Sequence, residues 1–360
     1  MNEQLNYTVT PRYIFPQIMQ NTDLSKKLLE VSTRSLPPIK AKSFQPFETV
    51  LEYLEQKPQS DFSLDLELKA ISPTLTPLNA IDETPIIGID VSCIRIGETE
   101  TGIICAIRGA IVWNVNHHYS YLRIGPFPFH ITEENKCEVL NHSNGKAFSK
   151  IGLHFSSLSE VLGRLCSQIE RWIQTTVSYS TKNSIILWDG SLATSVQSNF
   201  NEVFRIIKIA RNQGNVILGI TKITTIRFLD WKITDIISSH EAPCLFEIED
   251  LPLQDTRNMH FLGRIYIAKL AKSGSTFRLD IDRAITKEEG IRAVQKLIGN
   301  DLIYQGYPEC LRLAHIYSTF TANDVLGIQS FLTHEYGLKI LPRNNMRKVL
   351  FGPYGTGFED

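Results

Sequence analysis

The sequence has few cysteines, no long apolar run and almost no excess charge, and each of these scarcities excludes a class of protein. No CxxC pair occurs among its six cysteines, so neither a zinc ribbon nor a disulfide framework is indicated. No uninterrupted apolar segment approaches the roughly 18 to 20 residues that cross a bilayer, and the first residues lack the basic and apolar stretches of a secretion signal. We therefore expect a cytoplasmic protein with no membrane partner.

The charge balance argues against a protein that coats DNA through a broad basic face. The formal net charge is −1, whereas neutralising phosphates along a duplex requires clustered lysine and arginine. Basic residues do become denser at 205–222 and at 343–348, although solvated helix faces explain such clusters as well. With 42% hydrophobic and 21% charged residues, the composition is that of a folded globular protein, so any contact with nucleic acid is expected to be local.

Residues 1–80 are polar and rich in proline, with helical periodicity over 13–32 and 47–56 and an extended connector over 71–77. This pattern predicts an N-terminal helical extension packed on a core that begins near Thr84. We expect the main domain to span 84–340 and a tail to span 341–360.

From residue 85 the pattern changes to strands. Apolar, β-branched runs over 86–90, 101–115 and 117–124 predict an antiparallel meander, and the helical spacing over 156–179 predicts a long helix that returns to a strand ending at residue 189. Strands and helices then alternate to residue 336. This order predicts an α/β fold, a mixed sheet flanked by helices that resembles the ribonuclease H-like nucleases.

Two aspartates carry the strongest functional signal. Asp90 and Asp189 each follow a short apolar run, 85–89 and 184–188, and each is followed by small residues. Such runs suit strands buried on both faces, and carboxylates at strand ends lie where ligands bind in open α/β sheets. Two acids aimed at one point predict a site for a divalent cation.

A third carboxylate is expected from the long helix. Glu170 lies 19 residues before Asp189, on the helix that must pack against the second aspartate's strand. Glu160, ten residues earlier on the same helix, is the reserve candidate. For either glutamate the alternative is an ordinary solvated acid on an amphipathic helix.

His315 and Lys222 complete the candidate set. His315 stands in an otherwise apolar helical segment, where an imidazole could bind a metal such as Mn²⁺ or protonate a leaving oxygen, or simply belong to the core. Lys222 follows a predicted strand over 215–220 and could meet the scissile phosphate as a point charge, or be a surface lysine.

Together these motifs resemble the NurA-domain nucleases. That family has an aspartate after its first strand in a D-G-S-like motif, a helical glutamate, a D-G-S-L aspartate, an S-K pair and a late histidine. This chain has Asp90-Val91-Ser92, Glu170, Asp189-Gly190-Ser191-Leu192, Thr221-Lys222, and Tyr307-Pro308 followed by His315, in the same order between about residues 84 and 320. It departs from the pattern at Val91, where glycine is usual, and at Thr221, where serine is usual.

The resemblance implies a DNA nuclease that uses one or two Mn²⁺ ions, with Mg²⁺ as the alternative. Asp90, Glu170, Asp189 and His315 would hold the metal, and Lys222 would join them in catalysis. It also implies 5′ to 3′ exonuclease and single-strand endonuclease activity, a homodimer, and a HerA-type hexameric ATPase as partner in DNA end resection and repair.

Two other functions stay open on the residues alone. Val91 and the weak basic charge favour a non-catalytic partner or scaffold of a DNA translocase. An ATP-binding relative of the actin-like or kinase-like type would need a glycine-rich phosphate loop. The chain offers only the turn after Asp189 and a late glycine-rich stretch, 352–357, with no helix after it.

Overall fold

The computed structural model describes residues 24–47, 65–66, 75–81, 84–142, 157–195, 200–222, 259–341 and most of the stretch 224–248. The helix predicted over 47–56 and the tail predicted over 341–360 lie almost wholly outside these residues. Among the helices described, none is both long and apolar enough to cross a membrane.

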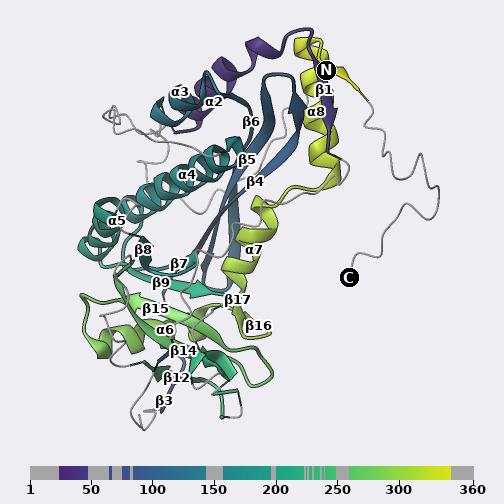
Figure 1. The fold of residues 1–360 in the computed structure, drawn as a ribbon. Coiled ribbons are helices and arrows are strands. Elements are labelled where there is room, and N and C mark those ends of the chain that lie inside the picture. The colour runs from purple at the N-terminus through teal and green to yellow at the C-terminus, as the bar shows by residue number, and fades with distance from the viewer. Residues whose placement is uncertain are drawn as a thin grey trace, which may run out of the picture.

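A large mixed β-sheet runs through the described part of the chain (Figure 1). Its strands, in chain order, are β1 (Ser43–Pro46), β3 (Leu75–Pro77), β4 (Ile86–Thr99), β5 (Gly102–Val115), β6 (His118–Thr132), β7 (Ile185–Asp189), β9 (Val216–Thr221), β12 (Cys244–Glu247), β14 (Gly263–Lys269), β15 (Phe277–Asp282) and β18 (Lys339–Ile340). Strands β4, β7 and β9 are parallel neighbours, and β5 and β6 extend the sheet from β4 as the predicted antiparallel meander. The α/β class, a ribonuclease H-like mixed sheet flanked by helices, is confirmed.

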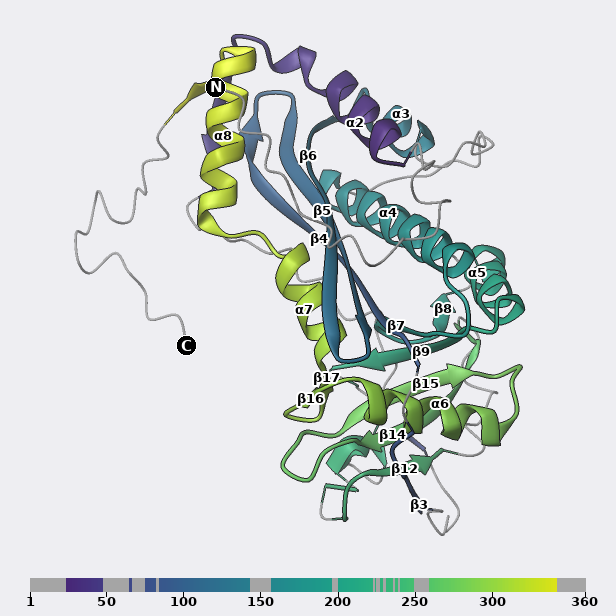
Figure 2. The same cartoon turned by 180° about the vertical axis from the view of Figure 1, so that it is seen from behind.

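Helices cover both faces of this sheet (Figures 1 and 2). One face is packed by α2 (Leu24–Ser35), α3 (Lys136–His142), α4 (Leu158–Ser180) and α5 (Phe200–Asn212). The other is packed by α6 (Lys287–Asn300) and α7 (Glu309–Ser318), while α8 (Ala322–Tyr336) covers the far ends of β4 and β5. The remaining elements are short: η1 (Pro37–Ile39), η2 (Ile233–Asp235), β2 (Asp65–Leu66), β8 (Ala193–Ser195), β10 (Arg227–Phe228), β11 (Trp231–Lys232), β13 (Met259–Phe261), β16 (Ile303–Tyr304) and β17 (Tyr307–Pro308).

Alternation along β4 decides which side chains meet which helix layer. Ile87, Ile89 and Val91 enter the core shared with α4, whereas Ile86 enters the core shared with α7. Gly88 points to the α7 side, where a Cβ would lie 2.5 Å from the carbonyl oxygen of Cys310. The missing side chain lets α7 lie directly on β4, and so fixes the helix that carries His315.

Strand β4 is longer than predicted. The prediction that Asp90 lies at the end of its strand is therefore wrong. The strand continues nine residues past Asp90, to Thr99, because β5 pairs with it over nearly its whole length. What ends beside Asp90 is the pairing of β4 with β7, whose last matched pair is Ile89 with Trp188. Asp90 therefore lies where two neighbouring strands separate.

The N-terminal part of the chain supplies strands to the main sheet as well as a helix. Strand β1 pairs with the far end of β4, and β3 pairs with β12. Of the helix predicted over 13–32, the structure describes only the part from Leu24 onward, where α2 begins. The division into an extension over 1–80, a domain over 84–340 and a tail stays a prediction.

Candidate metal centre

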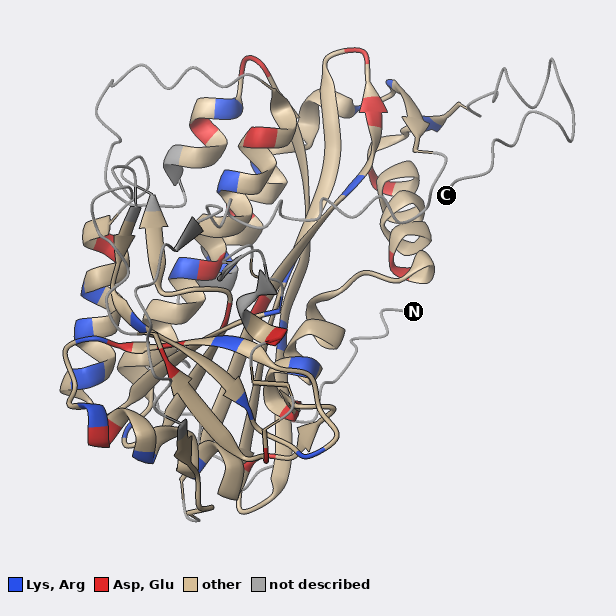
Figure 3. Cartoon of the chain, turned by 60° about the horizontal axis from the view of Figure 1, so that its bottom comes forward, with Lys and Arg blue, Asp and Glu red and all other residues tan. Residues whose placement is uncertain are grey.

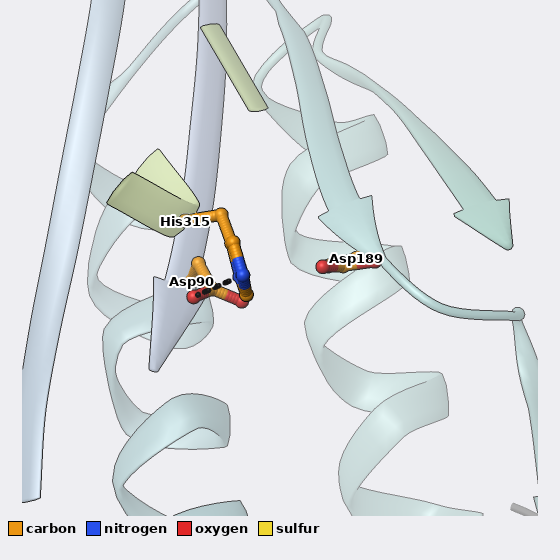
Figure 4. A group of neighbouring side chains, drawn as sticks. All are labelled: Asp90, Asp189 and His315. Atoms are coloured by element: carbon orange, nitrogen blue, oxygen red, sulfur yellow. Dashed lines mark ion pairs between the residues drawn. The ribbon is translucent and has the colours of Figure 1, made fainter. Parts of the chain in front are cut away.

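Strand register brings the two predicted aspartates together. In the parallel pair β4 and β7, Ile89 lies opposite Trp188, and the next residue on each strand is Asp90 and Asp189. One ligand atom from each aspartate and one from His315 lie within 4.8 Å of one another (Figure 4). Three elements distant in sequence thus converge on one point.

Helix α7 delivers the histidine. His315 Nδ1 lies 3.3 Å from Asp90 Oδ2, and the histidine side chain is 50% exposed. One turn later on the same helix, the Ser318 hydroxyl donates to the same carboxylate oxygen of Asp90. Two side chains of α7 therefore contact the Asp90 carboxylate. Figure 4 shows Asp189 on the neighbouring strand.

Lys222 lies against the second aspartate. Asp189 is matched with Ile220 on β9, and Lys222 follows two residues later on the same side of that strand. Its Nζ is 2.6 Å from Asp189 Oδ2. Burial raises the pKa of the Asp189 carboxyl, the Lys222 ammonium opposes that rise, and the charge of Asp90 adds to it.

Glu170 approaches from the α4 side of the sheet. The residue keeps some exposed surface, but protein atoms enclose its carboxylate, and this burial raises its pKa to about 7. Arg171 opposes the rise, and the charges of Asp90 and Asp189 add to it. Gln174 donates its Nε2 to Glu170 Oε1 at 2.9 Å. The Glu170 carboxylate thus interacts electrostatically with both aspartates. It is not one of the three residues whose ligand atoms lie within 4.8 Å of one another.

The reserve candidate lies away from this group. Glu160 is in the first turn of α4 and forms an ion pair with Arg164 at 2.8 Å. Ten residues of helix separate it from Glu170, a distance of about 15 Å. Of the two glutamates, only Glu170 is placed to act with the aspartates.

Two hydroxyl groups beside the aspartates were missed as site residues. Tyr307, on β17, is nine-tenths buried, and its ring centre lies 5.4 Å from Lys222 Nζ. Burial raises the pKa of Tyr307 well above its ordinary value, and the charges of Asp189 and Asp90 add to the rise. Ser318 is the other. Their sequence signals were the Tyr307-Pro308 motif and the one-turn spacing of Ser318 from His315.

Val91 stands where the NurA-domain nucleases usually have glycine, but its side chain does not occupy the space around the two aspartates. Its side chain is 5% exposed and belongs to the core shared with α4, on the strand face opposite to Asp90. The methyl groups of Val91 are therefore accommodated by the core and point away from the carboxylates.

Two members of the basic cluster over 205–222, Arg211 and Lys222, form ion pairs with acids. Arg211, in one of the basic clusters seen in the sequence, forms an ion pair with Asp282 at 2.8 Å. Figure 3 shows lysine and arginine interspersed with aspartate and glutamate over the described elements. The cluster over 343–348 lies outside the described residues.

The donor set fits a divalent cation. Asp90 and Asp189 offer oxygen ligands on adjacent strands, and their mutual repulsion contributes to the raised pKa of Asp189. Carboxylate oxygens suit Mg²⁺ and Mn²⁺ alike, whereas the imidazole of His315 suits Mn²⁺ better. A cation between the two aspartates would offset the repulsion between their carboxylates.

Comparisons with known proteins returned solved structures only, because no protein-family model and no curated protein matches the sequence. The NurA nuclease from Sulfolobus solfataricus has a TM-score of 0.48 and 14% identity, over 89% of this chain and 97% of that one. A further NurA structure has a TM-score of 0.38 and 8% identity, over 71% of this chain and 90% of that one. Endonuclease V from Bacillus subtilis has a TM-score of 0.35 and 13% identity, over 72% of this chain and 88% of that one. Two of these three structures are NurA nucleases, the family that the motifs resemble.

Proposed function

We propose that this chain is a metal-dependent DNA nuclease that hydrolyses phosphodiester bonds. The observation that carries the proposal is the convergence of Asp90, Asp189 and His315 from two adjacent strands and one helix. Two carboxylates and an imidazole within 4.8 Å form a donor set for one divalent cation, and Glu170, whose pKa the charges of both aspartates raise, would join it or serve a second cation. We propose Mn²⁺ as the natural ion and Mg²⁺ as its substitute.

The residues would divide the chemistry among them. Asp90, Glu170, Asp189 and His315 would hold the cation, which when bound lowers the pKa of a coordinated water and offsets charge on the phosphate oxygens. Lys222 reaches Asp189 from the strand end and would place its ammonium on a phosphate oxygen. His315 keeps half of its side chain exposed, so it could also deliver a proton to the leaving oxygen.

Finer properties of the proposed enzyme rest on the motif resemblance. They are 5′ to 3′ exonuclease and single-strand endonuclease activity, a homodimer in the cytoplasm, and a HerA-type hexameric ATPase as partner in DNA end resection and repair. The small net charge supports a local DNA contact supplied by a partner or a dimer channel over a broad cationic surface.

The test is cleavage of end-labelled single- and double-stranded DNA by the purified full chain in Mn²⁺, in Mg²⁺ and in a chelator. We expect cleavage in Mn²⁺, weaker cleavage in Mg²⁺ and none in chelator. Asp90→Asn and Asp189→Asn should abolish cleavage, whereas Glu160→Gln, which alters an acid of the same helix layer away from the centre, should not. Full Mn²⁺-dependent cleavage by either aspartate variant would overturn the proposal.

One observation favours a second candidate, a non-catalytic scaffold of a DNA translocase. The Lys222 ammonium already lies 2.6 Å from Asp189, and so neutralises one carboxylate of the centre from within the chain. A scaffold would keep this ion pair and ignore added metal. A melting temperature that stays unchanged in Mn²⁺ and Mg²⁺, together with uncut DNA, would select this candidate over the nuclease.

A further inference from the structure

Ser318 is a fully buried hydroxyl that touches the candidate centre from behind. It is 0% exposed and lies at the last residue of α7. Its Oγ donates to Asp90 Oδ2 and lies 3.0 Å from the His315 carbonyl oxygen and 2.9 Å from Ser92 Oγ. The hydroxyl thus joins helix α7 to strand β4 at the carboxylate itself.

The hydrogen bonds of this cluster have one consistent direction. A serine hydroxyl has a single hydrogen, and an ionised carboxylate is a stronger acceptor than a peptide carbonyl. Ser318 therefore gives its hydrogen to Asp90, and Ser92 gives its own to Ser318. The result is a relay of two hydroxyls that ends on one oxygen of Asp90.

The same oxygen also faces the histidine. His315 Nδ1 lies 3.3 Å from Oδ2, the oxygen that Ser318 contacts. With its hydrogen on Nδ1, His315 becomes the second donor to Oδ2 and keeps Nε2 free. Both donors thus come from α7 to Oδ2, and Oδ1 is the oxygen they leave for another partner.

We propose that Ser318, supported by Ser92, is a positioning residue that fixes the carboxylate of Asp90 through Oδ2 so that it meets the cation through Oδ1. This inference rests on the proposed function, because it assigns the residue that orients one of its metal ligands. Partners that orient a ligand commonly change metal affinity by 10- to 100-fold when they are removed.

Helix α7 is seated by contacts of its first turn that do not involve the Ser318 hydroxyl. Gly88 lets α7 lie against β4, and the Cys310 amide at the start of the helix donates to Asp301 Oδ2 at 3.0 Å. Replacing Ser318 by alanine therefore removes one oxygen atom without removing the contacts that seat the helix.

The experiment is calorimetric titration of the full chain with Mn²⁺ alone. We expect Ser318→Ala to bind Mn²⁺ about 10- to 100-fold more weakly than wild type. Ser92→Ala, which removes a neutral hydrogen bond one step further back, should weaken binding about fivefold. Ser178→Ala is the control, because Ser178 is a helical serine with 0% exposure whose Oγ has no hydrogen-bond partner, and it should bind like wild type.

Cleavage rates separate positioning from mere support of the fold. A positioning role predicts that the Mn²⁺ concentration for half-maximal cleavage rises in Ser318→Ala, that the rate at saturating Mn²⁺ returns to within a few-fold of wild type, and that the melting temperature in chelator changes little. Wild-type affinity in both Ser318→Ala and Ser92→Ala would overturn this inference and leave the nuclease intact. Absence of Mn²⁺ binding by the wild-type chain would overturn both.

Discussion

Replacing Asp189 by asparagine should make the metal-free protein more stable while removing its response to metal. The carboxyl of Asp189 has a raised pKa because of burial and of Asp90, so its ionised form is held in the folded state at a cost. An acid whose folded pKa is raised destabilises the fold above that pKa, and the loss of stability disappears as the pH falls through it. Near pH 7 the substitution therefore removes an unfavourable charge.

The magnitude follows from the geometry. Two unit charges 4.8 Å apart, the limit that the ligand atoms of Asp90 and Asp189 satisfy, repel by about 3.5 kcal/mol at an effective dielectric constant of about 20. Losing the ion pair with Lys222, whose side chain is 38% exposed, costs about 0 to 1 kcal/mol. Subtracting that cost from the repulsion leaves a net gain of about 2.5 to 3.5 kcal/mol in the free energy of unfolding.

Denaturant unfolding with and without Mn²⁺ checks both halves of this prediction. In chelator, Asp189→Asn should unfold at higher denaturant concentration than wild type. At a Mn²⁺ concentration 100 times the dissociation constant, wild type should gain about 2.7 kcal/mol and the variant far less. A variant less stable than wild type in chelator, or equally stabilised by Mn²⁺, would refute the reasoning.

Three further changes have defined outcomes. Burial lowers the pKa of His130 to about 4, so between pH 6.5 and pH 4 the unfolded chain binds a proton that the folded chain does not. The free energy of unfolding, measured by urea titration, should therefore fall by up to about 3 kcal/mol as the pH is lowered over this range, and His130→Gln should reduce this dependence on pH. Lys222→Met should slow DNA cleavage about 100-fold yet retain Mn²⁺ binding by calorimetry, because the proposed role of the lysine is to meet the phosphate and not the metal. An unchanged rate would remove it from the mechanism. Gly88→Ala places a Cβ 2.5 Å from the Cys310 carbonyl oxygen, so thermal melting should show about 1 to 3 kcal/mol of destabilisation and cleavage should drop as His315 shifts; a neutral variant would contradict this packing.

Local periodicity predicted the long helix before the second aspartate closely. The helix predicted over 156–179 is α4, Leu158–Ser180, because its apolar spacing repeats over more than five turns and Ser157 caps its start. The parts that failed depend on pairing between distant segments. Nothing near Asp90 reveals that β5 pairs along the whole of β4, and the short strands β1 and β3 exist only because β4 and β12 accept them.

The candidate centre divides in the same way. Asp90, Asp189 and His315 could be anticipated because each stands out from an apolar surrounding, where a polar side chain needs a reason. Ser318 was not anticipated, because a serine on a helix is ordinary until the fold places its hydroxyl beside a carboxylate. Tyr307 stood in a motif of the sequence, but its place beside the aspartates needed the fold. Glu170 was predicted from its position on the long helix. Only the register of the sheet shows that both aspartates lie near its buried carboxylate.

The most direct test of the account is anomalous diffraction from crystals of the protein soaked in Mn²⁺. We predict an anomalous peak between the carboxylates of Asp90 and Asp189, within bonding distance of both, with His315 and Glu170 beside it. Crystals that show the two aspartates without such a peak, or a peak elsewhere on the chain, would contradict it.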